Sequence, residues 1–236
     1  MSQVIVTGVA RADLEVVDRL AGFGVATVHE AIGRTGYLGS ELRPIQDGTR
    51  IGGTAITVLC WPGDNLMIHA AVEQCQAGDL LVVTTTSPST DGMFGDLLAT
   101  SLAARGVRGL VIEAGVRDTA ELRAMGFPVW SAAVSAQGTV KETPGAVNVP
   151  VCIGGQVVRP GDAVIADDDG VVCVPRAGVV AALAAAQARV AKEEQARKAL
   201  ADGRLGLDLY GLRDTLAARG VQYVDAAQAQ DMDVAP

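Results

Sequence analysis

The sequence predicts an α/β fold with a mixed sheet and a C-terminal helical extension. Between residues 53 and 134, β-branched apolar runs alternate with segments of helical spacing, which is typical of a sheet covered by helices. Residues 147–176 hold short β runs separated by GG, PGD and DDDG, and these favour antiparallel hairpins. Residues 177–200 are rich in Ala and charge and have a strong helical period. We therefore expect an α/β domain over 1–176, followed by a helix and tail over 177–236.

The individual elements follow from periodicity and from turn residues. Helical spacing ended by a glycine predicts helices at 11–22, 26–36, 65–78, 96–106 and 119–126. Runs of β-branched or continuous apolar residues predict strands at 53–60, 79–86, 108–115 and 127–134. The segment 87–95 is rich in Ser, Thr, Asp and Gly and is predicted to be a loop.

Composition limits the class of protein. The chain has 236 residues, of which 49% are hydrophobic, so it is long enough to bury a core without disulfides or structural metals. A net charge of −8 and an aromatic content of 3% argue against nucleic acid as a partner, because phosphates are repelled and few rings can stack on bases. An anionic substrate would need a site that locally reverses the sign of the charge.

Location is predicted from what the sequence lacks. It has no run of 18 apolar residues, and Asp13 comes too early for a signal peptide, so we expect a cytoplasmic protein with no membrane partner. Its four cysteines form no CxxC pair and lie in apolar contexts, which predicts buried thiols in a reducing compartment; they are Cys60, Cys75, Cys152 and Cys173.

A Gly-Asp pair opens the predicted helix 96–106. The first N–H groups of a helix have no partner inside the helix, and together with the helix dipole they form an anion site. Gly92 and Gly95 allow a ligand to approach the backbone closely. A ligand carboxylate could therefore bind the amides of residues 95–98. The alternative is that Asp96 only caps this helix or lies in its first turn.

An Arg-Asp pair follows the strand predicted at 108–115. Ligands of open α/β sheets gather beyond the carboxyl ends of the strands. There, Arg117 can clamp a carboxylate or stabilise a developing oxyanion, and Asp118 can hold a hard divalent cation. The alternative is that Asp118 caps the helix 119–125 and Arg117 is a solvated surface charge. Because successive strand–loop–helix units place their loops at one sheet edge, we expect Asp96 and this pair to face one pocket.

The spacing Asp96-x20-Arg117-Asp118 resembles the motif of the class II pyruvate aldolases, which cleave 4-hydroxy-4-methyl-2-oxoglutarate and 4-carboxy-4-hydroxy-2-oxoadipate. Further segments resemble the same family: GVATVHEAIGRTG (24–36), PGDNLMIHAAVEQ (62–74), SPSTDGMFGDLLATS (87–101), WSAAVSAQGTVKETPGAVNVPV (130–151) and PGDAVIADDDGVVCVP (160–175). The resemblance covers nearly the whole chain. It is closer to the carboxy-hydroxy-oxoadipate branch, whose members serve the protocatechuate 4,5-cleavage and gallate pathways.

The resemblance implies a fold and an assembly. The fold is a compact α-β-β-α sandwich of the swivelling β/β/α type. The assembly is a homotrimer, two of which pair into a homohexamer, with active sites between subunits. Glu193, on the C-terminal helix, matches an acid that reaches a neighbour's metal site. The alternative for Glu193 and the adjacent Glu194 is a charged helix face.

The resemblance also implies residue roles. Asp118 is the direct metal ligand, and Arg117 binds pyruvate and stabilises the enolate oxygen. Asp96 also holds water at the metal. The backbone amides that bind the pyruvate carboxylate are those of Gly95, Asp96, Leu97 and Leu98.

The chemistry favours a metal over a Schiff base. Retro-aldol cleavage leaves an electron pair on a ketone oxygen, which enzymes stabilise with a lysine imine or a metal ion. Of the three lysines, Lys192 and Lys198 lie in the helical extension and Lys141 lies in a polar, turn-like segment. We therefore expect Mg²⁺, with Mn²⁺ as the alternative. A contact between Lys141 and a distal substrate carboxylate is a further hypothesis.

The proton of the C4 hydroxyl group also needs an acceptor. We expect it to pass to water organised by Asp96 and Glu193. The same site should decarboxylate oxaloacetate, since that reaction also forms the enolate of pyruvate.

The two histidines are also candidates for the site. His29 and His69 lie in apolar helical patterns typical of core histidines, and His69 is the better candidate for a functional role because it follows the PGDN turn.

The alternative function is a protein-binding regulator, because the same superfamily contains an inhibitor of ribonuclease E activity. Those regulators lack the acid after the arginine, whereas this chain has Asp118. A methyltransferase is not favoured, because the sequence has no glycine-rich nucleotide loop.

Overall fold

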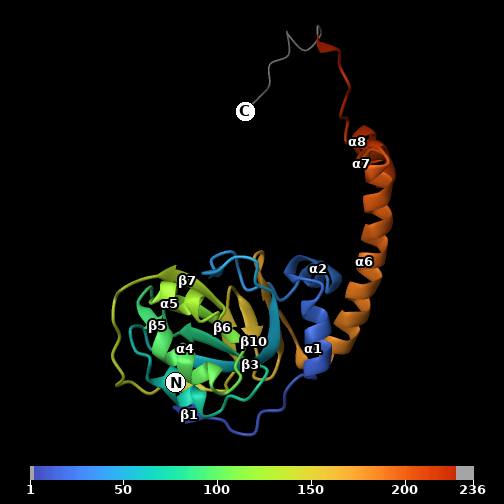
Figure 1. Ribbon diagram of the computed structural model, residues 1–236. Helices are drawn as coiled ribbons and strands as arrows, with labels where there is room; N and C mark the ends of the chain where they lie inside the picture. The colour runs from blue at the N-terminus through green and yellow to red at the C-terminus, as the bar shows by residue number, and fades with distance from the viewer. Residues whose placement is uncertain (1–2, 227–236) are drawn as a thin grey trace. The chain divides into compact units, whose positions relative to one another are not determined.

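The computed structural model describes residues 3–226. These divide into two compact units, of which the first ends at Arg189 and the second begins at Val190. The strands, all in the first unit (Figure 1), are β1 (Val4–Ile5), β2 (Arg43–Pro44), β3 (Ile51–Cys60), β4 (Asp79–Thr85), β5 (Gly92–Phe94), β6 (Gly109–Val116), β7 (Val129–Val134), β8 (Ala146–Val147), β9 (Val151–Ile153), β10 (Gln156–Val158), β11 (Ala163–Asp167) and β12 (Gly170–Val174).

The helices lie between and after these strands. Those that begin in the first unit are α1 (Leu14–Ala21), α2 (Val25–Ala31), α3 (Leu66–Val72), α4 (Asp96–Ala103), α5 (Thr119–Ala124), the 3₁₀ helix η1 (Arg176–Gly178) and α6 (Val179–Ala201). The second unit contains the end of α6, then α7 (Gly206–Leu209) and α8 (Leu212–Ala218). No helix in residues 3–226 combines the length and the apolar character needed to cross a bilayer.

The main sheet is mixed, as the sequence predicts. Ten strands join it, and its path runs β1-β8-β3-β4-β6-β7-β2. The neighbours β3, β4, β6 and β7 are parallel, whereas β11 pairs antiparallel with both β3 and β12. The hairpins predicted within 147–176 are confirmed, since β9 and β10 are also antiparallel. The parallel centre matters for function because it collects several strand ends at one edge.

Each face of the sheet carries its own core, because side chains alternate along a strand. On β4, Leu81 belongs to one apolar cluster with Ile68, Leu102 and Leu122 from α3, α4 and α5. The next residue back, Leu80, belongs to a second cluster. Its other members include Trp130 and residues of β9, β11 and β12. The three short helices therefore cover one face and the hairpins cover the other (Figure 1).

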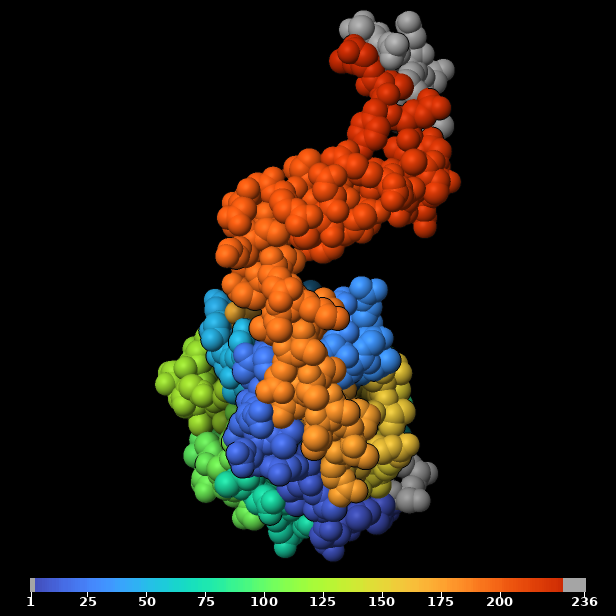
Figure 2. All heavy atoms as spheres, turned by 90° about the vertical axis from the view of Figure 1, so that its right-hand side faces the viewer, coloured from blue at the N-terminus to red at the C-terminus, as the bar shows by residue number. Residues whose placement is uncertain are grey.

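A third cluster joins α1, α2 and the start of α6. The buried α6 residues follow helical spacing: Val179, Ala182, Leu183 and Ala186. They pack with Val17, Leu20, Val25 and Val28 of α1 and α2 against β11 and β12. Figure 2 shows the first turns of α6, in orange, lying against these blue helices.

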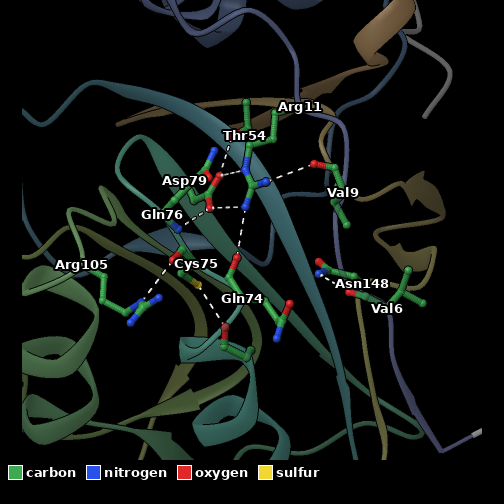
Figure 3. Close-up of polar contacts among 11 residues, drawn as sticks. Val6, Val9, Arg11, Thr54, Gln74, Cys75, Gln76, Asp79, Arg105 and Asn148 are labelled. Carbon is green, nitrogen blue, oxygen red and sulfur yellow. Dashed lines mark hydrogen bonds and ion pairs between the residues drawn. The ribbon is translucent and has the colours of Figure 1, made fainter.

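An ion pair anchors the amino end of β4. The Asp79 side chain is fully buried, and it accepts hydrogen bonds from Arg11 Nε (2.7 Å) and Arg11 Nη2 (2.9 Å). It also accepts from Thr54 Oγ1 (2.6 Å) and the Gln76 N–H (2.8 Å). Figure 3 shows these groups converging on the carboxylate. The pair fixes the 9–11 segment against the sheet, because Arg11 also donates to the carbonyls of Val9 and Gln74.

Two predictions need correction. The segment 87–95 is not entirely a loop, because β5 pairs in parallel with β6 through Gly92 and Phe94. A three-residue strand is too short to produce a period in the sequence. Cys152 is exposed, because it lies on the outward side of β9, whereas Cys60, Cys75 and Cys173 are buried as expected.

Candidate active site

The ends of β5 and β6 meet at one pocket. Gly95 follows β5 and Arg117-Asp118 follow β6, and the Arg117 N–H donates to the Phe94 carbonyl (2.8 Å). The pocket has a volume of about 100 Å³. Twelve residues line it: Asn65, His69, Gly92, Met93, Phe94, Gly95, Asp96, Leu97, Leu98, Arg117, Asp118 and Lys141.

The start of α4 forms one wall. Gly95 is the N-cap residue in an extended conformation and provides no side-chain cap. The Leu97 N–H donates to Asp96 Oδ1 (2.8 Å), and the Asp96 N–H makes a long bond to Asp118 Oδ2 (3.3 Å). Asp96 is thus a first-turn acid, as the alternative interpretation held, but it also lines the pocket. Two of the four amides expected to bind a substrate carboxylate, those of Asp96 and Leu97, therefore donate to protein carboxylates that a ligand would replace.

Asp118 has an unusual backbone. Its φ and ψ are 54° and 39°, in the left-handed region, where non-glycine residues are uncommon and Asp and Asn are the best tolerated of them. Asp118 occupies the N-cap position of α5, but its side chain makes no capping bond there. Its carboxylate lines the pocket instead, and Arg117 Nε lies 3.4 Å from its Oδ2. The simple capping role considered from sequence is therefore wrong.

Arg117 is half-exposed at the pocket, with its side chain 46% accessible. Gly95 and Gly92 leave space for the Arg117-Asp118 pair because neither has a side chain. A Cβ on Gly95 would lie 2.2 Å from Asp118 Oδ2 and 3.2 Å from Arg117 Cγ. A Cβ on Gly92 would lie 3.3 Å from Arg117 Cβ and only 2.4 Å from the Ser135 carbonyl oxygen. Gly95 thus permits the close approach of the start of α4 to the Arg-Asp pair, and Gly92 permits that of β5 to Ser135 and Arg117.

Asn65, His69 and Lys141 also line the pocket. Burial, and then the charge of Lys141, lower the pKa of His69, so its imidazole is neutral at neutral pH. The sequence singled out His69 and Lys141 but missed Asn65, which carries no sequence signal beyond its place after the PGD turn. Glu193 lies on α6 in the second unit, and its role stays a prediction.

The pocket can hold a divalent cation through few protein atoms. Among the described residues, Asp118 Oδ2 makes the two long polar contacts above and no shorter one, and the side chain is one-third exposed. No group of three or more His, Cys, Asp or Glu side chains that could hold a metal occurs within residues 3–226. This donor set fits Mg²⁺ or Mn²⁺, which bind through one or two carboxylates and keep several waters, and does not fit a closed zinc site.

Comparison with known proteins gives the family. The model of the RraA-like family, described as Aldolase/RraA, matches residues 16–173. A protein of Halalkalibacterium halodurans named "Putative 4-hydroxy-4-methyl-2-oxoglutarate aldolase" is 25% identical over 201 residues, covering 85% of this chain and 96% of its own. A protein of the same name from Burkholderia multivorans is 34% identical over 141 residues, covering 60% and 85%.

A solved structure agrees with these matches. Streptomyces coelicolor RraAS2, described as an unusual member of the RNase ES inhibitor RraA protein family, superposes with a TM-score of 0.71 at 32% identity. The match covers 80% of this chain and 99% of that one. On the family match and this shared mixed α/β structure, the chain belongs to the RraA-like aldolase family.

Proposed function

We propose that this protein is a divalent-metal-dependent aldolase. It would cleave 4-carboxy-4-hydroxy-2-oxoadipate to pyruvate and oxaloacetate, and 4-hydroxy-4-methyl-2-oxoglutarate to two molecules of pyruvate, in the breakdown of aromatic compounds. The observation that carries the proposal is the convergence of Asp118, Arg117 and the start of α4 on one small pocket. These are a cation ligand, an oxyanion partner and an anion-binding helix start.

Each group of pocket residues has a separate role in this proposal. The amides of residues 95–98 would bind the carboxylate of the pyruvyl half, and this ligand would replace Asp96 Oδ1 and Asp118 Oδ2 as acceptor. Arg117 would stabilise the negative charge that develops on the ketone oxygen when the C3–C4 bond breaks. A divalent cation at Asp118 would supply Lewis acidity at the same oxygen. Asp96, once released from Leu97, would take the C4 hydroxyl proton through a water molecule.

The assembly is part of the same proposal. We expect the compact α-β-β-α arrangement of this family, a trimer or hexamer, and a site completed between subunits. The C-terminal helix would pack on a neighbour, where Glu193 would assist in moving the proton. Oxaloacetate decarboxylation would be a side activity of the site.

Removal of the metal tests the proposal directly. Protein treated with a chelator and then dialysed is expected to release no pyruvate from 4-hydroxy-4-methyl-2-oxoglutarate or oxaloacetate, and Mg²⁺ or Mn²⁺ should restore the rate.

Asp118→Asn should lower kcat/KM by roughly 100-fold or more and abolish the response to added metal, because the cation loses its charged ligand. Asp47→Asn, at an exposed site, is the matched control.

The rival function is a protein-binding regulator, which the likeness to RraAS2 favours. A regulator should give no metal-dependent turnover with either substrate. Equal rates with and without chelator would contradict the aldolase proposal as well.

Gly95→Ala tests the close approach of α4 to Asp118. The added methyl group would lie 2.2 Å from Asp118 Oδ2, so the carboxylate must move. We expect the Mg²⁺ concentration for half-maximal activity to rise about tenfold or more, in the range that follows disturbance of a metal ligand's surroundings. Gly178→Ala is the control, because its methyl group would meet nothing within 4 Å. An unchanged metal response in Gly95→Ala would mean that Asp118 is not the ligand.

A further inference from the structure

Three polar side chains of the pocket have no part in the roles above. We name Asn65, His69 and Lys141 the distal wall. Asn65 is the N-cap residue of α3 and His69 lies four residues later, in the last turn of this short helix, so they lie on the same side of it. Lys141 comes from the segment after β7 and is close enough for its charge to act on His69. The distal wall therefore combines a cation, a neutral imidazole and an amide.

A buried carboxylate holds this wall together. Asp64 is 2% exposed, and its Oδ1 accepts from the Leu66 N–H (2.9 Å). Its Oδ2 accepts from the Glu142 N–H (2.9 Å) and the Thr143 N–H (2.6 Å). Asp64 is thus a positioning residue that joins the start of α3 to the segment carrying Lys141.

Backbone bonds strengthen this junction. The Asn65 N–H donates to the Val140 carbonyl (3.0 Å), and the Val140 N–H donates to the Gly63 carbonyl (3.0 Å). Lys141 therefore lies between Val140 and Glu142, both of which are fixed by hydrogen bonds. Its backbone is held beside the pocket in advance of any ligand.

Asn65 carries a hydrogen-bonding atom that the protein leaves unused. The residue is 8% exposed, and its Nδ2 donates to the Met93 carbonyl (3.0 Å). Its Oδ1 is buried and has no partner among the described residues. A buried acceptor without a donor is unfavourable, and such atoms are few in folded proteins. This residue lines the pocket, so a ligand can supply the missing donor.

We propose that the distal wall binds the half of the substrate that departs as a second oxo acid, with Lys141 on the C4 carboxylate and Asn65 Oδ1 on the C4 hydroxyl. The inference rests on the proposed function and deepens it. The hydroxyl group is the only donor that such a doubly ionised 2-oxo acid offers, and Asn65 needs a donor. The bond orients the hydroxyl in the bound substrate. As the C3–C4 bond breaks, the hydroxyl releases Asn65 and its proton passes through water to Asp96, as in the proposed function. The substrates are 2-oxo acids with a hydroxyl and a carboxylate on one carbon.

Two substrates that differ at one group measure the role of Lys141. In 4-hydroxy-4-methyl-2-oxopentanoate, a methyl group replaces the C4 carboxylate of 4-hydroxy-4-methyl-2-oxoglutarate. With Mg²⁺ present, the unmodified protein should prefer the glutarate in kcat/KM. Lys141→Met should reduce that preference at least 30-fold, because the charged hydrogen bond exists with only one of the two substrates. Lys198→Met, which removes an exposed lysine of α6, should preserve it.

A second reaction tests the pyruvyl half of the pocket without the distal wall. Deuterium exchange at the methyl group of pyruvate, followed by NMR, needs only the pyruvyl half of the site. The ratio of cleavage rate to exchange rate should fall at least tenfold in Lys141→Met and in Asn65→Leu. An unchanged ratio, or an unchanged substrate preference in Lys141→Met, would overturn the inference.

Chemical trapping distinguishes binding from covalent catalysis. Borohydride added with pyruvate should leave the mass of the protein unchanged. A stable adduct on Lys141 would show an imine at this residue and overturn its role as a carboxylate partner. If the unmodified protein gives neither exchange nor cleavage with Mg²⁺, the proposed function itself fails, and the distal wall fails with it. Exchange and cleavage without the expected changes in the variants would remove only the distal-wall role.

Discussion

Arg117→Ala is expected to lower kcat/KM for pyruvate release from 4-hydroxy-4-methyl-2-oxoglutarate by about 1,000-fold. Loss of one donor to a developing oxyanion costs roughly 100- to 1,000-fold in rate, and Arg117 is also placed to bind the substrate carboxylate. Steady-state kinetics with saturating Mg²⁺ would measure the loss. The expected loss is mainly in kcat, because the ketone oxygen of the bound substrate carries no such charge and gains it only as the C3–C4 bond breaks.

Two variants make the result specific. Arg117→Lys keeps the charge but loses the planar fork, so it should recover only a small part of the activity. Arg43→Ala, which removes an exposed arginine of β2, should leave the rate unchanged. The Tm of Arg117→Ala should change little, because the side chain is half-exposed and its ion pair with Asp118 is long, at 3.4 Å. Near-normal turnover in Arg117→Ala would refute the assigned role.

Asp79→Ala is expected to give the largest loss of stability. The buried carboxylate binds Arg11 through two nitrogens and also receives Thr54 Oγ1 and the Gln76 N–H. Removing one partner of a buried ion pair leaves an uncompensated charge and costs about 3–5 kcal/mol. For a protein of this size, the Tm should fall by roughly 6–20 °C. Thermal unfolding followed by circular dichroism would measure it.

The control for this loss is a carboxylate without such partners. Asp47 is exposed, and Asp47→Ala should change the free energy of unfolding by less than about 0.5 kcal/mol. The double variant Arg11→Met, Asp79→Leu should recover part of the stability, because neither charge is then left unpaired. A loss below 1 kcal/mol in Asp79→Ala would show that the network contributes little to stability.

The sequence predicted the regular elements because their periods are long enough to read. Strands β3, β4 and β6 and helix α4 begin and end within a few residues of the expected bounds, since continuous apolar runs and glycine stops mark them. The parallel centre could be expected from their alternation with helices. The pairings of β1, β2, β5 and β8 could not, because strands of two or three residues depend on tertiary hydrogen bonds.

Part of the site could be predicted because the ends of the long strands can be located in the sequence. Two successive strand ends placed Asp96 and Arg117-Asp118 together, and this juxtaposition is observed. Asn65 was missed because an Asn after a turn is common, and its unpaired oxygen exists only in the folded protein. Lys141 was excluded as an imine-forming lysine but kept as a hypothetical contact to a distal substrate carboxylate. Its place in the pocket depends on Asp64, which draws a distant segment against α3 through hydrogen bonds to its backbone amides.

The left-handed backbone at Asp118 also limits how such a site can be lost during evolution. At φ 54°, alanine and branched residues are strained, whereas glycine, asparagine and aspartate are tolerated. A descendant that abandons chemistry yet keeps its shape is therefore expected to replace the acid with Asn or Gly. From such a lineage, a binding protein could arise on this scaffold without rebuilding the turn after β6.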